Sequence, residues 1–173
     1  MTRYAALLRG INVGGAKRIT MAELRAAFET QGFADVRTLL QSGNVVFDSA
    51  DAVDAKAVED AVAQSTGVRA SVVLLTAQQL RAIADANPLL DVATDPSRAT
   101  ITFVDGAQDT LARPGDADLA PERVVFAAHA VYQWCPDGIS KSKLPAKFFA
   151  SLGPQATARN LRTVTTLLGM LEE

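Results

Sequence analysis

Several polar side chains stand where predicted strands or turns end, and these residues are the best placed to bind a ligand. Arg9 comes late in the apolar run Tyr4–Ile11, where a buried guanidinium is costly unless it meets a carboxylate, a carbonyl or a ligand. Polar residues in similar positions are Asn12, Ser42, Asn44, Thr157, Arg159 and Asn160. We hypothesise that they converge with Arg9 on one anion-binding site. The alternative is a structural network, in which Asn44 is a left-handed turn residue, Asn160 or Thr157 caps a helix and Arg9 clamps the interior.

The glycine-rich stretch from Gly10 to Lys17 could contact a phosphate group through its main chain. Gly10 and Gly15 have the spacing of a nucleoside-triphosphate loop, but the Lys-Ser/Thr pair that must follow the second glycine is missing. A weaker hypothesis is that the amides of Gly14 and Gly15, together with Lys17 and the amino end of the next helix, hold a small anion. The alternative is that the glycines only form a turn.

The sequence predicts no metal site and no cofactor, and it assigns no catalytic residue. His129 is the only histidine and Cys135 the only cysteine, so neither a cysteine-clustered metal site nor an internal disulfide is possible. We expect His129 to be an exposed turn residue and Cys135 to be a buried apolar filler. Whether the protein is an enzyme is left open.

Residues 1–75 are expected to form a first half with the order β-α-β-β-α-β, which is ferredoxin-like. Apolar spacing and turn residues predict the strands at 4–11, 36–40, 45–48 and 68–75 and the helices at 20–31 and 54–65. Thr20 and Glu23 form a capping box at the start of the first helix. The turn at 41–44 joins the second and third strands.

Residues 98–173 are expected to form a second, degenerate ferredoxin-like half, and 76–97 to form a linking helix and loop. Strands are predicted at 99–104, 123–127 and 131–135, a helix at 145–152, a closing segment at 155–159 and a helix at 160–170. The last helix should bury Leu161, Val164, Leu168 and Leu171. The predicted fold class is therefore α+β, with two halves from an apparent duplication and antiparallel sheets covered by helices.

Composition narrows the class of protein. The chain has 173 residues, of which 49% are hydrophobic, and no apolar run reaches the roughly 18 to 20 residues that a membrane span needs. With no signal peptide predicted at the start, we expect a cytoplasmic protein without a membrane partner. The net charge of −2 conceals five basic and two acidic side chains in residues 1–34, and five basic and none acidic in 138–171. Together these ends would form an anion-attracting surface; otherwise they are ordinary solvated charge.

Three stretches of the chain resemble one family. They are ALLRGINVGG at Ala6–Gly15, QSGNVVF at Gln41–Phe47 and TARNLRTVTT at Thr157–Thr166. In this order they are similar to the bacterial proteins of the domain of unknown function 1697 family. The resemblance implies a cytosolic protein built of two ferredoxin-like halves, and it implies no reaction.

The predicted function is a binding domain for a small anionic or phosphate-bearing ligand. One alternative is a nucleic-acid-associated module, because Lys141, Lys143 and Lys147 lie close to Phe148 and Phe149. A second alternative is a phosphate-handling enzyme without a recognisable catalytic motif. No feature of the sequence indicates an oligomeric state.

Overall fold

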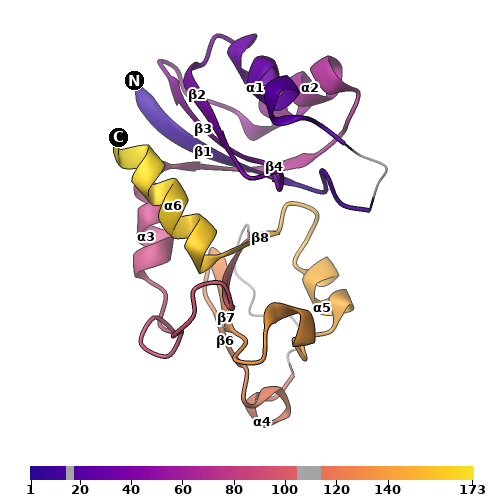
Figure 1. The fold of residues 1–173 in the computed structure, drawn as a ribbon, viewed down its shortest axis with the longest axis vertical. Coiled ribbons are helices and arrows are strands. Elements are labelled where there is room, and N and C mark those ends of the chain that lie inside the picture. Colours follow the sequence, from indigo (N-terminus) through magenta and orange to yellow (C-terminus); the bar gives the residue numbers. More distant parts are fainter. Residues whose placement is uncertain (15–17, 105–113) are drawn as a thin grey trace. The chain divides into compact units, whose positions relative to one another are not determined.

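The computed structural model describes residues 1–14, 18–104 and 114–173 (Figure 1). The chain divides into two compact units. The first comprises Met1–Arg81 and Leu167–Glu173, and the second comprises Ala82–Thr166. The chain therefore returns to the first unit for its last seven residues.

The first unit is built on a four-stranded antiparallel sheet. Its elements are β1 (Thr2–Arg9), α1 (Met21–Glu29), β2 (Ala34–Leu39), β3 (Asn44–Ser49), α2 (Ala55–Thr66) and β4 (Ser71–Thr76), followed by the start of α3 (Ala77–Asp85). The strands lie in the order β2-β3-β1-β4, and every neighbouring pair is antiparallel. The order of elements predicted for residues 1–75 is therefore observed.

Successive side chains of β1 point to opposite faces of this sheet and are buried on both. Tyr4, Ala6 and Leu8 belong to the main core of the unit, together with Phe28 of α1 and Val62 of α2. Figure 1 shows α1 and α2 side by side over this face. The opposite face buries the intervening residues of β1, and in Figure 1 the end of α6 (Leu161–Glu172) lies on that side.

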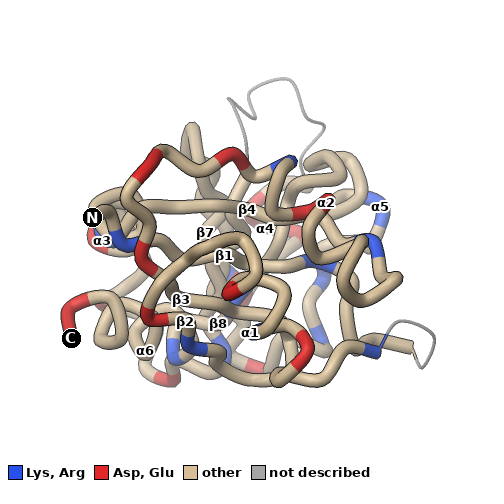
Figure 2. Tube along the Cα trace, turned by 90° about the horizontal axis from the view of Figure 1, so that it is seen from above, with Lys and Arg blue, Asp and Glu red and all other residues tan. Residues whose placement is uncertain are grey.

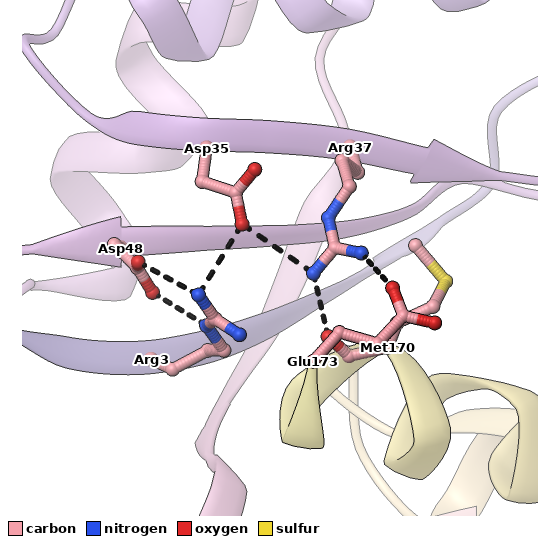
Figure 3. A network of polar contacts seen from close by, with 6 residues as sticks. All are labelled: Arg3, Asp35, Arg37, Asp48, Met170 and Glu173. Carbon is pink, nitrogen blue, oxygen red and sulfur yellow. Dashed lines mark hydrogen bonds and ion pairs between the residues drawn. The ribbon is translucent and has the colours of Figure 1, made fainter.

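An ionic network starts on the sheet next to the chain's amino end (Figure 3). Arg3 of β1 donates from Nε to Oδ1 of Asp48 at 2.7 Å and from Nη2 to Oδ2 at 3.0 Å. Nη2 of Arg3 also lies 3.3 Å from Oδ2 of Asp35. Asp35 has a φ of 47° at a register shift of β2. This irregularity turns its carboxylate towards the arginine.

Arg37 extends the network to the carboxyl end of α6. Its guanidinium contacts Asp35 at 3.4 Å, donates to the main-chain carbonyl of Met170 at 2.6 Å and pairs with Glu173. A cation that donates to the last carbonyls of a helix satisfies groups that have no partner inside the helix. Figure 3 shows this docking of the chain's last residues on β2.

The second unit repeats the same sheet order with smaller helices. Its elements are β5 (Ala99–Phe103), α4 (Asp116–Leu119), β6 (Arg123–Phe126), β7 (Ala130–Trp134), the 3-10 turn η1 (Ile139–Lys141), α5 (Ala146–Ser151) and β8 (Thr157–Asn160), with the end of α3 and the start of α6. The strands lie in the order β6-β7-β5-β8, again antiparallel throughout. In both sheets the order is second, third, first and fourth strand, so the protein is an α+β fold with two similar halves.

The buried face of α6 differs from the predicted one. Val164, Leu167 and Leu171 are buried, whereas Leu161 and Leu168 are only half-buried. The helix begins at Leu161, so its first side chain is at the end of the buried stripe. Helical spacing from Val164 allows either Leu167 or Leu168 to be buried, and the packing of the folded chain buries Leu167. Among the described residues, no helix is long and apolar enough to cross a bilayer.

Candidate functional site

The loop after β1 has an unusual backbone. Gly10, Asn12 and Gly14 have φ values of 79°, 56° and 68°, and the residues between them are not left-handed. A main chain whose φ alternates in sign turns successive N–H groups towards one side and makes a concavity that suits an anion. The amides of residues 12–14 donate to no oxygen within the described parts of the chain.

The Asn12 side chain holds this loop in place. Its Oδ1 accepts from the amide of Ile19 at 2.9 Å, and its Nδ2 donates to the Ile19 carbonyl at 3.0 Å. The same Nδ2 donates to the carbonyl of Gln41 at 2.8 Å. Both hydrogens of Nδ2 are therefore used, so Asn12 shapes the loop and joins it to the β2–β3 turn.

The β2–β3 turn packs tightly against the loop. The carbonyl of Gly43 accepts from the amide of Leu8 at 2.8 Å. A Cβ added to Gly43 would lie 2.6 Å from Cδ1 of Ile11 and 3.0 Å from Cβ of Leu8. Glycine is needed here both for this approach and for its φ of 84°.

Asn44 supports the turn from inside and is not its left-handed residue. The left-handed positions are Leu40, with a φ of 59°, and Gly43, whereas Asn44 is the first residue of β3 and is fully buried. Its Nδ2 donates to the carbonyl of Leu39 at 2.8 Å and to Oγ of Ser42 at 3.2 Å. The predicted left-handed role of Asn44 is therefore wrong, because its amide group is needed as a donor under the turn.

The amino end of α1 already holds a carboxylate. The predicted capping box is present: Thr20 Oγ1 accepts from the Glu23 amide at 3.1 Å, and the Thr20 amide donates to Oε2 of Glu23 at 2.8 Å. These hydrogen bonds, first from the Thr20 main chain and then from its hydroxyl, hold the pKa of Glu23 below its ordinary value. A second anion at this helix end would meet the Glu23 charge, so the loop amides are the better anion site.

Some of the other residues predicted for this site belong to the described part of the chain, and others do not. Arg9 ends β1, is half-buried and lies opposite Ser71 of β4. Gly15 and Lys17 lie outside the described residues. Arg18 is exposed beyond them. Of the predicted site residues, the structure thus brings four together at one end of the first sheet: Arg9, Asn12, Ser42 and Asn44. Gly14 follows Asn12 in the same loop.

The other three predicted residues lie in β8 of the second unit. Nη1 of Arg159 donates to Oγ1 of Thr157 at 2.8 Å and to the carbonyl of Ala158 at 2.8 Å. Arg159 is buried, and the burial lowers its pKa to about 10. Asn160 caps α6, because its Oδ1 accepts from the amide and the hydroxyl of Thr163, both at 2.8 Å. The hypothesis that Arg9 and Arg159 share one site joins two different units and stays a prediction.

A buried polar cluster in the second unit was not predicted. Glu122 is buried, and its carboxylate accepts from Gln133 Nε2, from Ser142 Oγ at 2.9 Å and from the Lys143 amide at 2.8 Å. Gln133 also donates to Ser142 Oγ at 2.8 Å. An acidic residue just before a predicted strand gives no signal of such burial. The cluster ties the segment 138–144 to the sheet.

A small cavity of about 20 Å³ lies beside this cluster. That volume holds about one water molecule. Its lining includes Cys135, whose pKa is raised to about 12 by burial and by the nearby Glu122 charge, so the thiol is not a nucleophile at neutral pH. No group of three or more metal-ligating side chains occurs in the described residues. The cavity is therefore best explained as part of the packing of the 138–144 segment.

Some of the lysine and phenylalanine side chains that suggested nucleic-acid binding make contacts within the second unit. Figure 2 shows basic residues along the segment that includes α5, and residues 138–171 have no acidic side chain. Lys143 Nζ, however, donates to the carbonyl of Ala120. Phe148 is buried against Phe126 and Phe149 and so presents no ring for base stacking. His129 is an exposed turn residue, as predicted.

Comparison with known proteins places the chain in a family. The family model "Protein of unknown function (DUF1697)" matches residues 1–132. The structure of the conserved bacterial protein SP0830 from Streptococcus pneumoniae is similar, with 26% sequence identity, a TM-score of 0.71 and coverage of 100% of this chain and 99% of that chain. No curated protein matches the sequence. Since the family model covers well over half of its residues, the chain belongs to the DUF1697 family of proteins of unknown function.

Proposed function

We propose that this protein binds a small anionic ligand, through a phosphate or carboxylate group, at the main-chain amides of residues 12–14. The observation that carries the proposal is the alternation of φ from Gly10 to Gly14 beside amides that have no acceptor among the described residues. Such concavities bind anions because several N–H dipoles point at one place. A cytoplasmic location, as predicted from the sequence, is part of this proposal.

The charge around the loop supports an anion. No Asp or Glu occurs in residues 10–22 or 38–47, and Arg18 and Lys17 follow the loop in sequence. Val13 and Gly14 are exposed, so a ligand has access to their amides. Ser42 belongs to the adjoining turn, and Arg9 precedes the loop; both remain candidate contacts. Thr157, Arg159 and Asn160 are less strongly supported, because the contacts described for them are those of a strand and a helix cap.

The two alternatives draw no specific support from the described residues. A nucleic-acid module would need exposed aromatic rings or a free basic strip, and Phe148 belongs to the hydrophobic core. A phosphate-handling enzyme would need a base or a nucleophile near the loop, and the described residues of the loop, 10–14 and 18–20, include no His, Cys, Asp or Glu. Anion binding is therefore the function that we put to the test.

The test compares two variants that differ only in charge at position 14. Asparagine and aspartate both tolerate the left-handed conformation, and a Cβ at Gly14 meets no atom of the described residues within 4 Å. Amide resonances are followed by NMR while inorganic phosphate is added. We expect phosphate to shift the resonances of residues 12–14 in the wild-type protein and in Gly14→Asn.

Gly14→Asp should bind phosphate at least about fivefold more weakly than Gly14→Asn. Two like charges about 4 Å apart cost about 1 kcal/mol in water and more near a protein surface, and 1.4 kcal/mol is a factor of ten. Equal affinities of the two variants would show that the phosphate binds elsewhere. Absence of any shift at residues 12–14 in the wild-type protein would refute the proposal directly.

A further inference from the structure

Two exposed apolar side chains flank the loop amides. Val13 is 67% exposed and Leu40 is 58% exposed. Val13 follows Asn12 in the sequence, and Leu40 precedes Gln41. Asn12 Nδ2 donates a hydrogen bond of 2.8 Å to the Gln41 carbonyl. This bond and the packing of Gly43 on Ile11 hold the two segments together. The two apolar side chains are therefore exposed on two segments that are joined next to the proposed anion site.

Leu40 is in a conformation that leucine disfavours. Its φ of 59° lies in the left-handed region, which asparagine and glycine adopt more easily. A turn that only joined two strands would be more stable with one of those residues, and it would also expose less apolar surface. Unfavourable backbone conformations are found most often at sites that bind ligands. An exposed leucine held in this way points to an apolar contact.

We propose that the preferred ligands of this site are phosphate monoesters that carry an apolar group. The anionic end would lie on the amides of residues 12–14, and the apolar group would cover Leu40 and Val13. This inference rests on the proposed function and adds the chemical class of the ligand. Neither segment carries an acidic side chain that would repel the phosphate.

The experiment uses phenyl phosphate and inorganic phosphate as probes, again with NMR detection of residues 12–14. The variant is Leu40→Asn, which keeps a residue suited to the left-handed turn, and the control is Leu90→Asn, an exposed leucine of the second unit with 48% exposure. Val13→Ser is a second variant that does not alter the turn. Circular dichroism verifies that each variant is folded.

We expect the wild-type protein to bind phenyl phosphate about tenfold more tightly than inorganic phosphate, since covering about 60 Å² of apolar surface gives a factor of that size. Leu40→Asn should reduce this preference severalfold without changing the affinity for inorganic phosphate. Val13→Ser should reduce the ratio of the two affinities severalfold, and Leu90→Asn should leave both affinities unchanged.

Equal affinities for the two probes in the wild-type protein would overturn the inference while leaving the proposed function intact. A preference for phenyl phosphate that survives in both Leu40→Asn and Val13→Ser would overturn it as well, because the apolar contact would lie elsewhere. If neither probe shifts residues 12–14, the proposed function fails first, and the inference fails with it.

Discussion

Among the described glycines in left-handed turns of the first unit, Gly43 should be the one whose substitution by alanine destabilises the unit most. Gly43 is held against the loop after β1, where an added Cβ would lie 2.6 Å from Cδ1 and 3.0 Å from Cγ1 of Ile11, and 3.0 Å from Cβ of Leu8. Ile11 and Leu8 are both buried. The terminal methyl of Ile11 can move, but Cβ of Leu8 is fixed by the backbone of β1.

The expected loss of stability has two parts. A left-handed alanine costs roughly 1–2 kcal/mol relative to glycine, and an extra methyl group in a packed interior costs roughly 1–3 kcal/mol. Gly32 is a matched control, since its φ of 83° is almost that of Gly43 and, within the part of the chain that the structure describes, a Cβ there meets no atom within 4 Å. Gly32→Ala should therefore show only the first part.

Native-state hydrogen exchange measures this difference in the unit concerned. Amides in the middle of β1, from Ala5 to Leu7, are buried and should report the free energy of unfolding of the first unit. We expect Gly43→Ala to lower that free energy by at least about 1 kcal/mol more than Gly32→Ala does. Equal effects of the two substitutions would show that left-handed strain alone requires glycine, and the close contact with Ile11 and Leu8 would then have no energetic weight.

Two further predictions concern buried and paired carboxylates. Glu122→Gln should lower the stability of the second unit by about 1.5–3 kcal/mol, because a charged acceptor of three hydrogen bonds is replaced by a neutral group that brings its own donors. The fluorescence of Trp134 in β7 follows this unfolding, and Asp91→Asn, at an exposed position, serves as the control. Equal effects of the two substitutions would contradict the prediction. Asp48 has its pKa held below its ordinary value of 3.8, chiefly by the hydrogen bond from Arg3. A lowered folded-state pKa stabilises the protein above the ordinary value, and this contribution is lost as the pH falls through the lowered pKa. The stability difference between wild type and Asp48→Asn should thus be constant above about pH 5 and shrink below pH 3.8 in urea titrations, and a difference that does not depend on pH would contradict the assignment.

The fold followed from local signals that survive in a single sequence. Thr20 and Glu23 mark the start of α1 by a hydrogen-bond exchange between residues three apart. Alternation in β1 and the 41–44 turn determine which strands pair. The prediction that α6 buries Leu168 was wrong, since Leu167 is buried in its place. A one-residue shift of the buried face of a helix depends on tertiary packing, which the periodicity of the sequence does not contain.

The sequence singled out residues that the structure places around the loop after β1, but it did not predict their contacts. Asn12 and Asn44 were singled out as polar residues at the ends of elements, and Asn12 lies in that loop while Asn44 lies under the adjoining turn. Their partners are main-chain carbonyls of residues far away in the sequence, such as Gln41 for Asn12. Glu122 gave no signal at all, since its three donors come together only in the folded chain.

These roles change how the polar residues of the site are understood. If Asn12 and Asn44 contacted a ligand directly, their amide groups would need free donors, but the Nδ2 of each is already engaged with main-chain or neighbouring oxygens. What these side chains do is hold the loop and the turn in their shapes through hydrogen bonds to the main chain. A rigid set of amides loses little entropy on binding an anion. The side chains that looked like ligands in the sequence are thus better understood as the scaffold of the proposed main-chain site, whose selectivity, as we propose, depends on the apolar residues beside it.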